Sequence, residues 1–168
     1  SGIILLIERP IKVGDIIQMG SASGMIVDIR VRSTVVRTRD EVTIIVPNSK
    51  LISEDVLNNS YSGKTIRQHL KVGVSYDADV QLVQKILSGV ASRHPKVLKD
   101  PSPVVIFEDF GESSLDFDLR FFSSELWNVD VVASEIRSEI LTELRKVDIE
   151  IPYPQRDVHF KNTAIELK

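Results

Sequence analysis

The side chains that could do chemistry are spread along this sequence and form no recognised catalytic or metal-binding motif. His69, His94 and His159 make no HxH or HExxH pair, and the chain has no cysteine to complete a zinc site. Asp116 and Asp118 have the spacing of paired carboxylates, but they alternate with apolar residues, so we interpret them as solvated residues on the outer face of a strand. No GxGxxG, GxxxxGK[ST] or GxSxG motif occurs. The sequence therefore predicts no enzymatic activity, no cofactor and no metal.

The overall composition is that of an ordinary globular protein. Hydrophobic residues make up 42% and charged residues 27% of the 168 positions, with a net charge of −3. This mildly acidic balance argues against the basic surface that nucleic-acid-binding proteins need, so we predict no nucleic-acid partner. The absence of cysteine fits a reducing compartment.

An apolar run, Ile3–Ile7, lies at the beginning of the chain. It is far shorter than the roughly 20 apolar residues of a membrane-spanning helix. The first residue is serine and no basic region precedes the run, so a signal peptide is not indicated. We interpret the sequence as a fragment of a longer protein.

The elements that must position these side chains fall into two groups. In residues 12–60, the alternation over 25–32 predicts a half-buried strand, with Ile26 on the outer face together with three charged residues. Residues 42–46 predict another strand. Pro47 should end that strand because proline has no N–H to donate, and a helix of a turn or two is expected around 48–53. Several short strands in about 50 residues indicate a small β-barrel or sandwich.

After a linker predicted at 60–64, the pattern changes to strands alternating with helices. Residues 70–76 predict a strand, followed by an amphipathic helix with Asp77 as its N-cap and an end at His94. Two strands joined near Gly111, a second helix and a final strand at 149–151 complete the order βαββαβ. This order is typical of a ferredoxin-like unit, so the predicted fold class is α+β.

Several sequence motifs, read in order, resemble the soluble region of the small-conductance mechanosensitive channel (MscS-like) family. They are RPIKVGDII, SGMIVDIRVRSTVVRT, VTIIVPNSKLIS, VGVSYDADVQLVQKIL and IPYPQRDVHF, which cover essentially the whole chain. The matching positions of the first three motifs are Arg9, Pro10, Val13, Gly14, Asp15, Gly24, Ile29, Arg32, Thr34, Arg37, Pro47, Asn48 and Leu51. The chain departs from the family pattern at Ile11, at Met25, and at the Arg39-Asp40-Glu41 turn, where an Asp-Gly-type turn is usual.

The resemblance implies a domain organisation and the residues that matter in it. Residues 1–11 would end the pore-proximal membrane helix, 12–61 would form an Sm-like β domain, 65–154 a ferredoxin-like domain, and 155–168 a C-terminal barrel strand and tail. Arg9, Pro10 and Lys12 would couple the β domain to the membrane, with Arg9 and Lys12 near anionic lipid headgroups. Val158 and Phe160 would lie in the short strand that closes the vestibule floor as a parallel barrel.

The resemblance also implies a function. The chain would be the cytoplasmic vestibule of a tension-gated ion channel of the inner membrane, which responds to osmotic stress and passes ions and small solutes. Subunits would assemble as a homo-oligomeric ring, a heptamer, below transmembrane helices that would precede Ser1. Two alternatives from other classes are a soluble Sm-like RNA-binding module and a small-ligand-sensing module.

Overall fold

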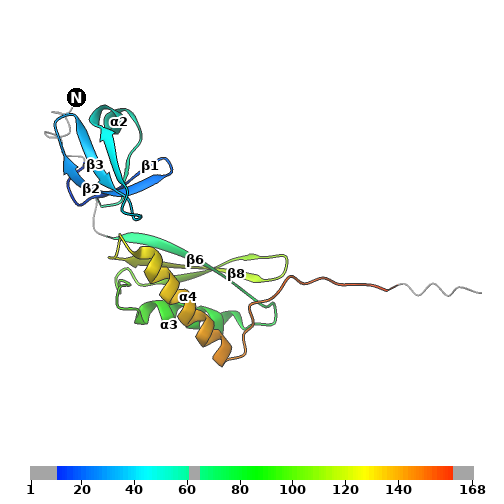
Figure 1. Ribbon diagram of the computed structural model, residues 1–168. Helices are drawn as coiled ribbons and strands as arrows, with labels where there is room; N and C mark the ends of the chain where they lie inside the picture. Colours follow the sequence, from blue (N-terminus) through cyan, green and yellow to red (C-terminus); the bar gives the residue numbers. More distant parts are fainter. Residues whose placement is uncertain (1–10, 61–64, 161–168) are drawn as a thin grey trace, which may run out of the picture.

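The chain folds into two domains with separate cores, seen in a computed structural model that describes residues 11–60 and 65–160 (Figure 1). Each domain has its own antiparallel sheet, and the second adds two helices, which confirms the predicted α+β class. The linker prediction falls mainly on residues 61–64, outside the described residues. No helix in the described ranges has both the length and the apolar character needed to cross a membrane.

The first domain is a five-stranded sheet with one short helix. Its strands have the order β4-β3-β2-β1-β5, every neighbouring pair being antiparallel. The elements are β1 (Ile16–Met19), β2 (Ala22–Ile29), β3 (Ser33–Arg37), β4 (Thr43–Pro47), α2 (Asn48–Ser53) and β5 (Leu57–Asn58). Pro47 ends β4 and the short helix follows directly, as predicted.

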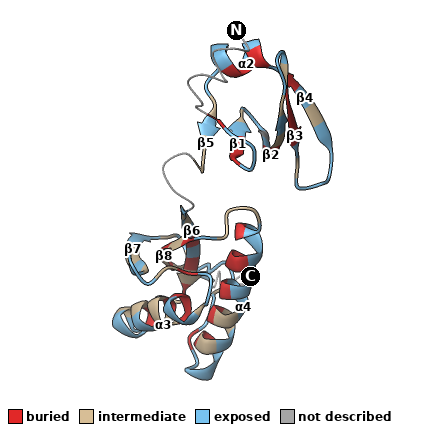
Figure 2. Ribbon diagram, turned by 90° about the vertical axis from the view of Figure 1, so that its left-hand side faces the viewer, coloured by how far each residue is buried: buried red, intermediate tan, exposed pale blue. Residues whose placement is uncertain are grey.

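The strand β2 does not follow the simple alternation that its sequence predicts. Ile26 was expected on the charged face, but it is fully buried in the core of the first domain, and Val31 is exposed. Figure 2 colours the ribbon by burial, with buried residues in red. The reason is a β-bulge between Ile26 and Asp28, where the pairing with β3 shifts by one residue. Because a bulge inserts one residue, Ile26 and Ile29 can both face the core although they are three positions apart.

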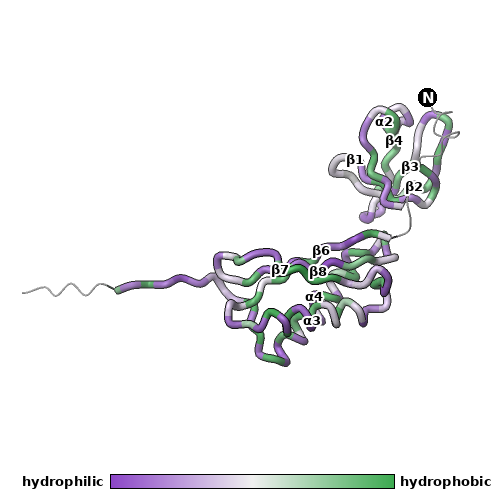
Figure 3. The backbone as a smooth tube through the Cα atoms, turned by 180° about the vertical axis from the view of Figure 1, so that it is seen from behind, coloured by the Kyte–Doolittle hydropathy of each residue, from purple (hydrophilic) through white to green (hydrophobic). Residues whose placement is uncertain are grey.

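The second domain packs two helices on one face of a three-stranded sheet. Its strands have the order β6-β8-β7, and both helices lie on the same side of this sheet (Figure 1). The elements are β6 (Ile66–Val74), α3 (Val80–Arg93), β7 (Val104–Phe110), β8 (Leu115–Ser123) and α4 (Val129–Lys146). Hydrophobic residues colour much of the central strand β8 in Figure 3. Phe117, Leu119 and Phe121 of that strand are buried against the helices, as the alternation predicted.

The helix α3 begins two residues later than predicted. Asp79, not Asp77, is the N-cap: its Oδ1 accepts hydrogen bonds from the N–H groups of Gln81 (2.8 Å) and Leu82 (3.1 Å). Residues 75–78 form a turn that is closed by a hydrogen bond from Ala78 N to Ser75 O. Asp77 is part of this turn and therefore precedes the helix. The predicted end at His94 is confirmed, since His94 is the C-cap.

The predicted fourth strand at 149–151 is wrong for the described chain. Only one hydrogen bond, from Ser75 N to Glu150 O (2.9 Å), begins to pair this segment with the end of β6. Pro152 and Pro154 follow, and neither can donate a backbone hydrogen bond, so the ladder does not continue. The ferredoxin-like order is therefore present as βαββα with an incomplete last strand.

Candidate functional site

The KVGD turn is held together by the buried carboxylate of Asp15. Its Oδ2 accepts hydrogen bonds from Lys12 N (3.1 Å) and from Asn58 Nδ2 (2.7 Å), which joins the turn before β1 to β5. Gly14 has φ = 92°, a left-handed conformation that favours glycine, and its N–H bonds to Ile26 O. Gly14 and Asp15 therefore shape the β domain, while the Lys12 side chain is exposed.

A second motif pair, Thr34 and Asn48, forms a buried polar bridge. Thr34 Oγ1 donates to Asn48 Oδ1 (2.9 Å), and both side chains are almost fully buried. Asn48 Nδ2 donates in turn to the carbonyl groups of Arg30 (2.8 Å) and Val31 (3.2 Å). The asparagine after Pro47 thus satisfies the backbone between β2 and β3, which explains why an amide suits this position.

Gly24 lies where two strands approach too closely for a side chain. A Cβ at this position would lie 2.5 Å from Val36 Cγ1 and 2.8 Å from the carbonyl oxygen of Arg37. The second of these is backbone of β3 and cannot rotate away. The glycine of the motif is therefore required by sheet packing.

The remaining predicted residues do not gather into one pocket. Arg32 and Arg37 are exposed, and Arg37 pairs with Glu41 at 3.6 Å within its own hairpin. Arg9 and Pro10 lie outside the described residues. Val158 and Phe160 have no assigned secondary structure and are 68% and 90% exposed in the single chain.

The uncovered face of the second sheet carries a charge cluster that sequence reasoning missed. Asp118 was predicted to be solvated, but it is fully buried. Arg120 Nε donates to its Oδ2 at 2.6 Å, His69 Nδ1 lies at 2.9 Å from the same oxygen, and Lys71 Nζ at 3.6 Å. Lys71 also binds Glu108 on β7. Alternation put Asp118 on the correct face, but long side chains from the same and the neighbouring strand cover it.

These partners change the acidity of the cluster. Burial acts to raise the pKa of the Asp118 carboxyl, but hydrogen bonds from Arg120 and His69 and the charges of His69 and Lys71 outweigh burial. The pKa of Asp118 therefore lies below its ordinary value. Lys71 shows the complementary effect, because its hydrogen bond to Glu108 raises its pKa. The cluster behaves as a set of ion pairs that joins the three strands.

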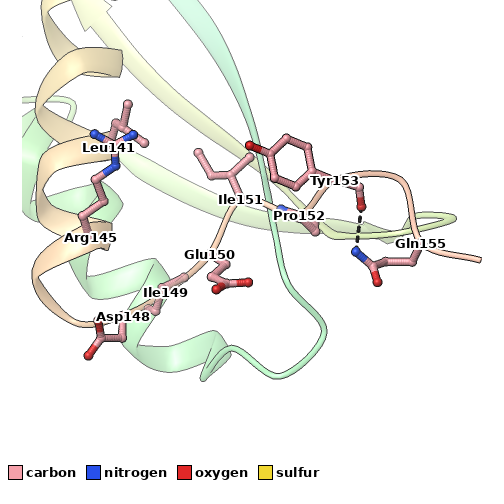
Figure 4. Close-up of a pocket in the computed structure, with 9 residues that line it drawn as sticks. All are labelled: Leu141, Arg145, Asp148, Ile149, Glu150, Ile151, Pro152, Tyr153 and Gln155. Carbon is pink, nitrogen blue, oxygen red and sulfur yellow. Dashed lines mark hydrogen bonds between the residues drawn. The ribbon is translucent and has the colours of Figure 1, made fainter.

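A pocket of about 390 Å³ lies between α4 and the segment that follows it (Figure 4). Leu141 and Arg145 come from the helix, and Ile151 and Tyr153 from the segment. The nine lining residues include no histidine, serine or cysteine, so the pocket holds no Ser–His or Cys–His pair. Across the described ranges, no group of three or more histidine, cysteine, aspartate or glutamate residues could hold a metal.

Both domains match models of known protein families. The model of the mechanosensitive ion channel β-domain matches residues 1–61, and that of the mechanosensitive ion channel MscS C-terminal region matches 69–151. The chain belongs to the MscS family of mechanosensitive ion channels. This membership supports the channel-family interpretation over the RNA-binding and ligand-sensing alternatives.

Relatives in the MscS family match nearly the whole chain. Mechanosensitive channel MscK of Escherichia coli K12 is 37% identical over 96% of the chain, and an MscS family protein of Archaeoglobus fulgidus is 36% identical over 96%. The chain spans 14% and 56% of the lengths of these two relatives. The closed-state crystal structure of Helicobacter pylori MscS is 31% identical and has a TM-score of 0.84, with 96% of this chain and 64% of that chain covered.

Proposed function

We propose that this chain is the cytoplasmic vestibule region of a tension-gated ion channel. The observation that carries the proposal is the ordered match of both MscS-family regions, together with the TM-score of 0.84 to Helicobacter pylori MscS. The described side chains fit this role, because the motif residues stabilise turns and strand contacts and bring together no catalytic group. We propose a structural and coupling role for the region.

The β domain has an edge that suits assembly into a ring. Strand β4 is at one edge of the sheet. Ile45 on this strand is 63% exposed, and Val42 just before the strand is 56% exposed. An exposed apolar strand edge invites pairing with another chain, and a closed ring of copies removes every such edge. We propose a homo-oligomeric ring, a heptamer, in which this edge meets the β domain of the neighbouring subunit.

The end of the chain suits a second contact between subunits. The segment 152–160 is extended and exposed, and Val158 and Phe160 have no apolar neighbours that would bury them within the described chain. In a ring, the same segment from every copy would be at the same level. We propose that these segments close the vestibule floor as a parallel barrel.

The membrane side of the ring would be at the opposite end. Lys12 is exposed next to the buried Ile11, at the start of the β domain. We propose that Arg9, Pro10 and Lys12 couple this domain to membrane helices and to anionic lipid of the inner membrane, with the chain on the cytoplasmic side. Tension would favour the open state because that state has the larger in-plane area, and ions and small solutes would pass through the vestibule.

Native mass spectrometry of the full-length protein in detergent tests the ring. We expect a single species with the mass of a heptamer, because the β4 edge and the C-terminal segment both need partners. A stable monomer under conditions that keep the protein folded would contradict the proposal. Truncation after Tyr153 is a useful second sample, since it removes the barrel segment and should weaken the ring without unfolding either domain.

A further inference from the structure

Described contacts that join the two domains converge on one side chain, Arg39, at the tip of the β3–β4 hairpin. Its Nη2 donates to the carbonyl oxygen of Leu126 at 3.4 Å, and its Nη1 lies 3.7 Å from Asp130 Oδ1. Its guanidinium carbon is 5.7 Å from the ring centre of Trp127. Three different kinds of interaction therefore hold one arginine against the start of α4.

The hairpin tip presents Arg39 in a fixed geometry. Thr38 N donates to Val42 O (2.9 Å), Glu41 N donates to Thr38 O (3.1 Å), and Val42 N donates to Thr38 Oγ1 (3.2 Å). Glu41 has φ = 60°, which closes the turn tightly. A tip with this many internal hydrogen bonds loses little conformational freedom when its arginine binds, which favours the contact.

The receiving surface matches an arginine and not a lysine. A planar guanidinium can stack on an aromatic ring and still direct its N–H groups to a carbonyl and a carboxylate in the same plane. Trp127 supplies the ring, Leu126 the carbonyl and Asp130 the carboxylate. Asp130 is also in the first turn of α4, where the helix dipole stabilises a negative charge.

We propose that Arg39 is an interdomain latch that fixes the orientation of the β domain on the second domain. The two cores share no residue, so each domain can be stable by itself and the contacts between them must set their relative orientation. Arg39 belongs to the Arg39-Asp40-Glu41 turn, which is outside the motif positions that the chain shares with the family pattern. If the proposed channel function holds, the latch connects the ring of β domains to the vestibule wall.

Fluorescence of Trp127 tests whether the contact forms. Trp127 is the only tryptophan of this sequence, and its signal in the full-length protein is isolated by subtraction of a Trp127→Phe variant. We expect Arg39→Ala to increase quenching of Trp127 by acrylamide, because one face of the ring loses its cover. Arg37→Ala is the matched control, since Arg37 is on the same hairpin but pairs with Glu41, and it should leave quenching unchanged. Equal quenching in wild type and Arg39→Ala would overturn the latch.

Distances between spin labels test whether the contact fixes orientation. This sequence has no cysteine, so labels can be attached at Ser49→Cys on α2 and Lys85→Cys on α3, both exposed, after any cysteine elsewhere in the full-length protein is replaced by serine. Labelled subunits are diluted with unlabelled ones, so that only distances within a subunit are measured. We expect Arg39→Ala to broaden and shift the distance distribution, Arg39→Lys to do so less, and Arg37→Ala to match wild type. An unchanged distribution in folded Arg39→Ala would overturn the proposal, whether or not the full-length protein conducts ions.

Discussion

At the scale of single residues, Gly24 is a position where the structure leaves no room for a side chain. We expect Gly24→Val to destabilise the β domain by about 3 kcal/mol or more, because its Cβ would overlap the backbone carbonyl of Arg37 and the strands would have to separate. Thermal unfolding and oligomer mass measure this, and the ring should be lost with the domain. Gly89→Ala is the control: its Cβ would meet only Arg93 Nη1 at 3.5 Å, so it should be neutral or stabilising. A normal melting temperature for Gly24→Val would contradict the close approach.

The charge cluster around Asp118 makes stability depend on pH. Since the folded state lowers the pKa of Asp118, the carboxylate stabilises the fold above its unfolded pKa of about 4, and this contribution is lost as the pH falls through the folded pKa. We expect Asp118→Asn to reduce the free energy of unfolding at pH 7 by about 1–3 kcal/mol. The difference from wild type should shrink below about pH 4.

Denaturant unfolding across this pH range checks the prediction for Asp118. Asp77→Asn removes the same charge from an exposed side chain and serves as the matched control. A difference between wild type and Asp118→Asn that stays constant from neutral to acid pH would contradict the role of the ionised carboxylate.

At the scale of elements, the start of α3 depends on one cap. We expect Asp79→Ala to destabilise the second domain by about 1 kcal/mol, because the N–H groups of Gln81 and Leu82 lose their acceptor. Asp77→Ala should have a much smaller effect, although both carboxylates precede the same helix. Chemical denaturation of the two variants decides between the two caps, and a larger loss for Asp77→Ala would show that the cap is misassigned.

The sequence predicts those features of a helix or strand that depend only on the residues of that element. Periodicity predicted the buried face of β8 and both helices, because each apolar position repeats within its own element. It could not predict the bulge next to Ile26 or the burial of Asp118, because these depend on a neighbouring strand. The importance of Gly24, Thr34 and Asn48 came from the family resemblance, and the structure supplies the physical reasons. The Arg39 contact joins residues about 90 positions apart and left no signal in the sequence.

At the scale of the whole molecule, a single copy leaves surfaces that a ring would cover. The β4 edge with Ile45 and the extended segment with Phe160 are apolar and exposed, and they lie in different parts of the chain. Each would be an aggregation risk in a monomer, while a closed ring satisfies both with copies of the same contact. The separate cores allow the two domains to be stabilised independently, with the Arg39 contact between them.

We infer that this region belongs to a channel opened by membrane tension. Patch-clamp recording of the full-length protein, expressed in cells that lack their own mechanosensitive channels, measures such opening. We predict currents that appear when suction is applied to the patch and disappear when it is released. The absence of suction-activated current, with the protein present in the membrane as an assembled ring, would contradict the claim.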